Sequence, residues 1–380
     1  MTEDAKRYNA SDFTVLHLWE AVRARPGMYV GSADERGLHQ AVFEVVGRAV
    51  NEVLAGRATT VDVTLTPDGG VSVADDGPAV PVELETLLTG MLAARRPGVG
   101  RDHANLDRFG LGSCVTNALS SRLTAEVRHD GTRWVQEYAR GVATAPPTAA
   151  GAAGGSGTTL TFWPDAGIFE TVECSFAVLE ERFRELAFLY RRLAISLTDA
   201  RVPGEPRSER FRFPGGARDF VAFLDAAAGP PVHPDVIAFE WEDDRMEGRA
   251  EVALRWCATR EERLRSFANS VPTREGGTHV AGFREGTAAA LTAYACERRL
   301  LSATEPDLDA ERIGEGLTAV VSVKLDHPEY GGATFGALGN AAVSACVREA
   351  VREHLGGWLE GHPEQAAAVV RRLLKDTSRS

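Results

Sequence analysis

The chain has 380 residues, of which 44% are hydrophobic and 25% charged, a composition typical of a soluble globular protein with enough length for two domains. Its net charge of −12 excludes a surface that is basic throughout, which a protein that coats DNA would need. The sequence has no apolar run long enough for a membrane span and no signal peptide, so we expect a cytoplasmic protein without membrane contact. Its five cysteines form no CxxC pair, which predicts neither disulfides nor a zinc site.

The first half of the chain contains one strongly periodic helix. Residues 1–14 are polar and predict an arm or a frayed terminus. Residues 38–54 predict an amphipathic helix whose apolar face is opposite a polar stripe. That stripe consists of Gln40, Glu44, Arg48 and Asn51. Strands are predicted at 61–65 and 71–74 around a Pro-Asp-Gly-Gly turn, and residues 90–110, which lack periodicity, predict a loop.

The sequence after residue 140 predicts a boundary between two domains. The low-complexity segment 141–157 predicts a flexible surface loop, and a helix follows over 176–193. We therefore divide the chain into an arm (1–14), a first domain (15–215) and a second, α/β domain (216–380), and we see no internal repeat. The elements predicted in the second domain are strands at 236–242, 250–257 and 318–325 and helices at 282–300 and 339–357.

Arginine is locally dense, and two interpretations stay open. The positions are Arg182, Arg184, Arg191 and Arg192, then Arg371, Arg372 and Arg379. These side chains either lie on solvated helix faces or form a basic inner surface that contacts DNA weakly.

Several motifs in order resemble one protein family. LWEAVRARPGMYVGS, FEVVGRAVNEVLAG, VSVADDGPAVP, RFGLGSCVTNALS, GTTLTFWP, SFANSVPTREGGTHVAGF and EGLTAVVSVKLDHPEY together span almost the whole chain. They resemble the ATPase region of DNA gyrase B and topoisomerase IV, which are GHKL ATPases. The resemblance implies an α+β protein in which a GHKL (Bergerat) ATPase α/β sandwich precedes a transducer domain like ribosomal protein S5. It also implies ATP or ADP as the ligand, and a homodimer or a gyrase or topoisomerase subunit as partner.

The resemblance assigns nucleotide-binding roles to matching positions. Asp75 would accept a hydrogen bond from the adenine amino group, and Thr158 would share a water with it. Asp-Asp-Gly by itself is also an ordinary turn signal. Glycines before a helix let backbone N–H groups approach phosphate oxygens. The implied nucleotide-binding residues are Asp75, Gly77, Gly110, Gly112, Thr158 and, in an arm that reaches the partner's site, Tyr8.

The hydrolytic positions are altered. Glu44 matches the general base of the family. Arg48 replaces the asparagine that holds magnesium, and Gly47 replaces a neighbouring aspartate. Because arginine cannot ligate a cation and repels one, a bound Mg²⁺ is doubtful. Spacing of i, i+4 on one helix also predicts that Arg48 pairs with Glu44.

Four further positions depart from the family pattern. Ala333 and Phe335 replace a glutamine and a lysine that reach the γ-phosphate. Pro78 and His129 replace two arginines that frame the aminocoumarin site. We therefore expect weak nucleotide binding and poor aminocoumarin binding.

Three hypotheses for function follow from this pattern. The first is a catalytically weakened, nucleotide-binding module that acts as a dimerising clamp or regulatory partner. The second is a working ATPase subunit of a type II topoisomerase, in which Arg48 supplies charge to the phosphates. The third is a repurposed protein that binds another small molecule, such as an antibiotic. The sequence shows no acidic EGDSA-type or DxD motif of a strand-passage core, so we expect no DNA cleavage by this chain alone.

Overall fold

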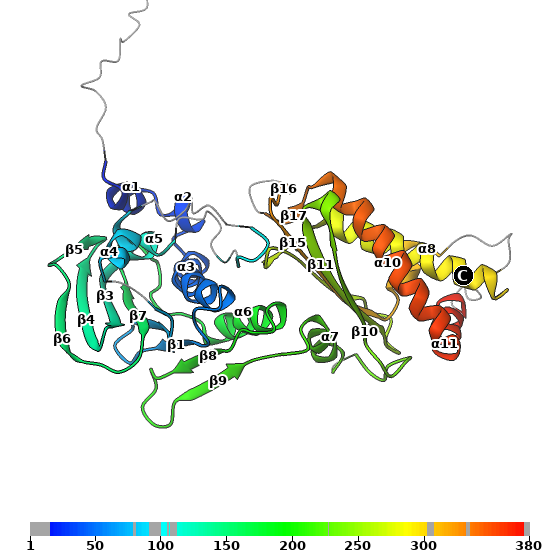
Figure 1. Ribbon diagram of the computed structural model, residues 1–380, viewed down its shortest axis with the longest axis horizontal. Helices are drawn as coiled ribbons and strands as arrows, with labels where there is room; N and C mark the ends of the chain where they lie inside the picture. Colours follow the sequence, from blue (N-terminus) through cyan, green and yellow to red (C-terminus); the bar gives the residue numbers. More distant parts are fainter. Residues whose placement is uncertain are drawn as a thin grey trace, which may run out of the picture.

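The computed structural model describes residues 16–78, 81–90, 100–104, 106, 112–226, 228–301, 308–331 and 335–375. Two α+β units lie next to each other, each with its own sheet (Figure 1). The hydrophobic core of the first consists mostly of residues between Val22 and Val221 and also includes Val236, Ala253, Phe267 and Val320, and the core of the second runs from Ile237 to Leu373. The predicted α+β fold is confirmed.

The first unit is built on a large mixed sheet in the order β5-β4-β3-β7-β2-β1-β8-β9, with β6 paired to β4. The predicted strands at 61–65 and 71–74 are confirmed, and the second extends to Asp75. The strands are β1 (Val61–Leu65), β2 (Val71–Asp75), β3 (Ser120–His129), β4 (Thr132–Ala139), β5 (Val142–Ala143), β6 (Thr148–Ala152), β7 (Gly157–Pro164), β8 (Ile195–Asp199) and β9 (Arg207–Phe211).

Helix α3 is the element that matters most for the site. It runs from Glu35 to Leu54, which confirms the predicted helix, and it begins three residues earlier because Asp34 caps it: Asp34 Oδ1 accepts from the backbone N–H of Arg36 at 2.9 Å. Its apolar side packs toward β1 and β2. The helices of this unit are α1 (Leu18–Ala24), α2 (Gly27–Val30), α3 (Glu35–Leu54), α4 (Pro81–Thr89), α5 (Ser113–Ala118) and α6 (Phe176–Leu189).

Two predictions for the first unit need correction. The segment 141–157 is not a simple flexible loop, because Thr148–Ala152 pairs antiparallel with β4 and Val142–Ala143 adds a short second pairing. All five residues of β6 are exposed, so backbone hydrogen bonds rather than side-chain burial hold this edge strand. The helix predicted over 176–193 ends at Leu189, where the chain turns into β8.

The second unit contains a sheet in the order β10-β11-β15-β12-β13, and the three strands and two helices predicted for it are confirmed to within a few residues. A small sheet, β14-β17-β16, lies at its edge. The strands are β10 (Ile237–Asp243), β11 (Gly248–Trp256), β12 (Arg263–Ala268), β13 (Val271–Pro272), β14 (Gly276–Gly277), β15 (Leu317–Leu325), β16 (Tyr330–Gly331) and β17 (Ala337–Leu338). The helices are α7 (Ala217–Asp225), η3 (Asp244–Met246), α8 (Thr278–Glu297), α9 (Ala310–Gly314), α10 (Ala341–Gly361) and α11 (Pro363–Lys375).

Strand β15 is buried on both of its faces. Ala319, Val321 and Val323 belong to the core of the second unit, whereas Val320 belongs to the core shared with the first. Helices α8 and α10 pack together along the sheet, and α7 contacts β11 and β15 (Figure 1). The second sheet is therefore covered on two sides, and the two units share apolar contacts. In the part of the chain that the structure describes, no helix is long and apolar enough to cross a membrane.

Candidate nucleotide-binding site

The polar stripe of α3 faces the end of β2. Arg48 and Asn51 are on this stripe, and Asp75 is the last residue of β2. The register of the sheet places Thr158 of β7 directly opposite Asp75. The tertiary structure therefore brings together most of the described residues that the sequence nominated.

Arg48 forms an ion pair with Asp75, not with Glu44. Its Nη2 donates to Asp75 Oδ2, and the side chains are 14% and 1% exposed. The i, i+4 pairing predicted from the sequence is thus wrong, because the fold brings the buried carboxylate of Asp75 within reach of Arg48, whereas Glu44 accepts hydrogen bonds from Gln40 and Gly112. Burial raises the pKa of Asp75, and Arg48 and a backbone N–H oppose that rise.

The second oxygen of Asp75 is also occupied. The backbone N–H of Gly77 donates to Oδ1 at 3.0 Å, and a Cβ at position 77 would lie equally close to that oxygen. Thr158 is fully buried, and its Oγ1 has no hydrogen-bond partner among the described residues. The Nε of Arg48 is also buried without a hydrogen-bond partner among the described residues. Two buried polar atoms at this end of the site therefore have capacity for a further ligand or water.

Glu44 lies on the same stripe, one turn before Arg48. It is 2% exposed, and its carboxylate accepts from Gln40 Nε2 at 3.2 Å and from the backbone N–H of Gly112 at 3.1 Å. Gly112 has a φ of +74° at the N-cap of α5, a conformation that favours glycine. The glycine predicted to approach a phosphate thus directs its N–H at the predicted base instead.

His103, Ala104 and Leu106 cover the stripe, in contacts that the sequence did not reveal. Asn51 Oδ1 accepts from the backbone N–H of Ala104 at 2.8 Å, and Asn51 Nδ2 lies 2.8 Å from His103 Nε2. Leu106 is buried, and a Cβ at Gly47 would approach its Cβ to 3.4 Å. The side of α3 at position 47 therefore faces Leu106, a neighbour that only the tertiary contact shows.

The stripe does not fit a magnesium ion. Mg²⁺ prefers carboxylate, amide and water oxygens in octahedral geometry, and here a guanidinium occupies the centre of the stripe. Among the described residues, no group of three or more His, Cys, Asp or Glu side chains could hold a metal ion. We derive no reaction step through a metal here.

Three further predicted positions belong to the described residues. Pro78 is exposed after β2. His129 Nε2 lies 3.3 Å from Asp130 Oδ2. The Phe335 ring packs edge-on against Tyr330, with ring centroids 5.0 Å apart. Because the side chain is a phenyl ring, this position carries no charge. Tyr8, Gly110 and Ala333 lie outside the described residues.

The first arginine cluster is largely neutralised within the chain. Arg182 pairs with Glu185 at 3.1 Å, Arg184 pairs with Glu180, and Arg191 pairs with Glu251 at 2.7 Å. These pairs favour structural roles over a basic surface that binds DNA. The five cysteines all lie in the described part of the chain, and none forms a disulfide.

A helix with a polar stripe lies over a mixed sheet, and a second α+β unit follows it. Residues 33–168 match the family model described as histidine kinase-, DNA gyrase B-, and HSP90-like ATPase, and residues 216–380 match the model of DNA gyrase B. The described site and the family match coincide at α3, β2 and α5.

Individual relatives and solved structures match almost the whole chain. DNA gyrase B of Streptomyces coelicolor is 43% identical over 389 residues, which cover 96% of this chain and 57% of that protein. The 43K ATPase domain of Thermus thermophilus gyrase B, solved with an aminocoumarin, is 31% identical with a TM-score of 0.79 and 94% of each chain covered. DNA gyrase B from Myxococcus xanthus has a TM-score of 0.78 at 29% identity, with 93% of this chain and 99% of that chain covered.

The chain belongs to the DNA gyrase B family and corresponds to its GHKL ATPase and transducer domains. It spans slightly less than three fifths of the length of the curated relatives it matches.

Proposed function

We propose that this gyrase B-like module does not turn over ATP and acts as a dimerising or regulatory partner related to type II topoisomerases. The observation that carries the proposal is the ion pair between Arg48 and Asp75. In this family the position of Asp75 reads adenine, and here both of its carboxylate oxygens already accept intramolecular hydrogen bonds. An adenine amino group would have to share these oxygens with Arg48 and Gly77, so the ion pair competes with adenine for Asp75.

The phosphate end of the site supports the same proposal. Hydrolysis needs a base, a metal and a cation on the γ-phosphate. Glu44 is present, but Arg48 replaces the metal ligand and the aromatic Phe335 replaces the lysine. Loss of one preorganised charge donor costs about 10² to 10³ in rate, and such losses are not additive. We therefore expect weak nucleotide binding that does not depend on magnesium.

Phosphate release by the purified chain tests the proposal. With millimolar ATP and Mg²⁺ we expect turnover at background, and Glu44→Ala should leave it unchanged because no catalysis exists to lose. The 43K domain of Thermus thermophilus gyrase B, measured in parallel, controls for assay conditions. Magnesium-dependent turnover comparable with that domain, abolished by Glu44→Ala, would overturn the proposal and favour a working ATPase subunit.

A reconstructed site sharpens the test. Arg48→Asn, Ala333→Gln and Phe335→Lys together should restore measurable turnover, whereas each alone should not, since base, metal and cation act as a unit. Light scattering with a non-hydrolysable ATP analogue tests the partner role. We expect a dimer population that the analogue does not change in the natural chain, and an analogue-driven dimer only in the reconstructed one.

A further inference from the structure

Residues 100–104 lie between the two domains. In Figure 1 this short segment passes between α3 and the end of the second sheet near β15. Its backbone contacts side chains of the first domain, and its own side chains contact the second domain. The contacts with each domain are of different kinds.

The contacts with the first domain are made by neutral groups. Asn51, at the C-terminal end of α3, accepts from the backbone N–H of Ala104 at 2.8 Å and donates to the Ala104 carbonyl at 3.2 Å. It therefore pairs with the backbone of the segment as a neighbouring strand would. The hydroxyl of Tyr190, just after α6, donates to the His103 carbonyl at 3.5 Å.

The contacts with the second domain are ionic. Arg101 donates from Nε to Asp326 Oδ1 at 3.0 Å and from Nη2 to Oδ2 at 2.7 Å, and it also pairs with Glu242 of β10. Asp102 Oδ1 accepts from Arg249 Nη2 of β11 at 2.7 Å. The forked bond with Arg101 lowers the pKa of Asp326 to about 2. Two adjacent residues of opposite charge thus contact β10, β11 and the residue that follows β15.

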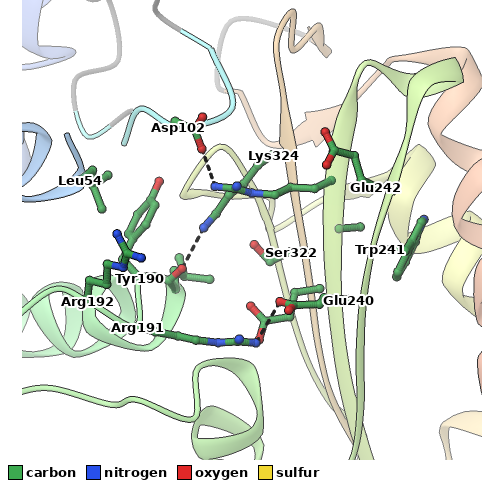
Figure 2. A pocket seen from close by; sticks show the side chains of 14 residues that line it. Leu54, Asp102, Tyr190, Arg191, Arg192, Glu240, Trp241, Glu242, Ser322 and Lys324 are labelled. Atoms are coloured by element: carbon green, nitrogen blue, oxygen red, sulfur yellow. Dashed lines mark hydrogen bonds and ion pairs between the residues drawn. The ribbon is translucent and has the colours of Figure 1, made fainter. Parts of the chain in front are cut away.

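A cavity of about 590 Å³ lies beside these contacts, lined by both domains. Figure 2 shows Asp102 at one side of it, where its carboxylate accepts the hydrogen bond from Arg249. Lys324 Nζ donates to the Leu189 carbonyl at 3.0 Å, and Arg191 pairs with Glu251 across the same space. Since Arg191 and Arg249 have carboxylate partners and Lys324 bonds to a carbonyl, this cavity suits interdomain pairing better than capture of a charged ligand.

We propose that residues 100–104 form an interdomain clamp that fixes the second domain relative to α3, with Arg101 as its main positioning residue. The clamp connects Asn51, one turn beyond Arg48 on the stripe, to β11 and to the residue after β15. It supplies a connection between the nucleotide-binding helix and the transducer that does not use Phe335. A group that displaces Ala104 from Asn51 would also loosen the ionic contacts.

The test compares domain orientation in matched variants of the full chain without nucleotide, so its outcome is independent of the proposed loss of turnover. Arg101→Ala should broaden the interdomain distance distribution from solution scattering and raise hydrogen exchange at the C-terminal end of α3 about tenfold. Arg245→Ala is the control, since Arg245 makes a similar pair, with Asp243 at 2.7 Å, inside the second domain. It should leave orientation and α3 exchange unchanged.

A charge exchange separates pairing from a folding defect. Asp102→Arg and Arg249→Glu should each loosen the domains, and the two together should restore the parent distribution because the pair is re-formed with reversed sign. About 1 M salt should weaken the parent in the same direction as Arg101→Ala. An unchanged distribution in Arg101→Ala, or a combined exchange as loose as the singles, would overturn the clamp.

Discussion

Two carboxylates of the first domain are almost equally buried but have different partners. Glu44 is 2% exposed and Asp75 is 3% exposed. Asp75 has a full counter-charge from Arg48, whereas the described hydrogen bonds of Glu44 come from the amide of Gln40 and the backbone of Gly112. Equal burial therefore does not decide the partner of a carboxylate, since Arg48 on α3 neutralises Asp75 across the fold.

The largest expected effect comes from removal of one member of the Arg48–Asp75 pair. Asp75→Ala leaves a buried guanidinium without a partner and should cost about 3–5 kcal/mol of unfolding free energy. Arg48→Met combined with Asp75→Leu should recover most of that loss. Urea denaturation measures both.

Glu126→Ala is the matched control for this prediction. Glu126 pairs with Arg133 at 2.7 Å, but these side chains are 35% and 41% exposed. Its loss should therefore cost at most about 1 kcal/mol. Equal costs for Asp75→Ala and Glu126→Ala would remove the distinction between the two kinds of pair.

Two buried histidines of the second domain, unlike the buried carboxylates, are uncharged in the folded state near neutral pH. Burial lowers the pKa of His233 and of His279 to about 4. The folded state therefore binds fewer protons than the unfolded state between about pH 4 and 6.5, so stability is full above this window and falls as pH falls through it. From pH 7 to 5 each histidine should cost about 2 kcal/mol. His233→Gln should flatten the pH dependence of denaturation, whereas exchange of the exposed His354 for Gln should leave the slope intact.

The ATP affinity of an Arg48 variant tests whether the Arg48–Asp75 pair limits nucleotide binding. Arg48→Asn frees Asp75 Oδ2, so calorimetry should show ATP affinity at least about tenfold above the parent, a gain of about 1.4 kcal/mol. Arg36→Asn, an exposed change at the start of α3, should have no effect. A parent chain that binds ATP as tightly as Arg48→Asn would mean that the ion pair opens without cost.

The smallest expected effect concerns aminocoumarin binding at Pro78 and His129. Neither Pro78 nor His129 can donate the forked hydrogen bonds of an arginine, so novobiocin should bind weakly. Pro78→Arg and His129→Arg should each raise affinity a few fold, roughly 1 kcal/mol, in a thermal-shift titration. Nanomolar binding by the parent would instead favour a protein that binds the antibiotic.

Local pattern was enough to predict α3, β1, β2 and the alternation of strands and helices in the second domain, because periodicity and turn residues act over a few positions. The motifs also singled out Asp75 and Thr158, which the sheet register places opposite each other, and Glu44, which lies on the same helix as Arg48. Edge pairing by β6 escaped prediction, since its alanines carry no alternating pattern.

The partners of the charged residues were decided only by the tertiary structure. A local i, i+4 rule paired Arg48 with Glu44, but the fold places the buried Asp75, 27 residues away, within reach. Arg101 and Asp326 are 225 residues apart, and nothing in either neighbourhood encodes their contact. Sequence spacing determines which side chains share a helix face, whereas burial and long-range packing determine which charges must neutralise one another.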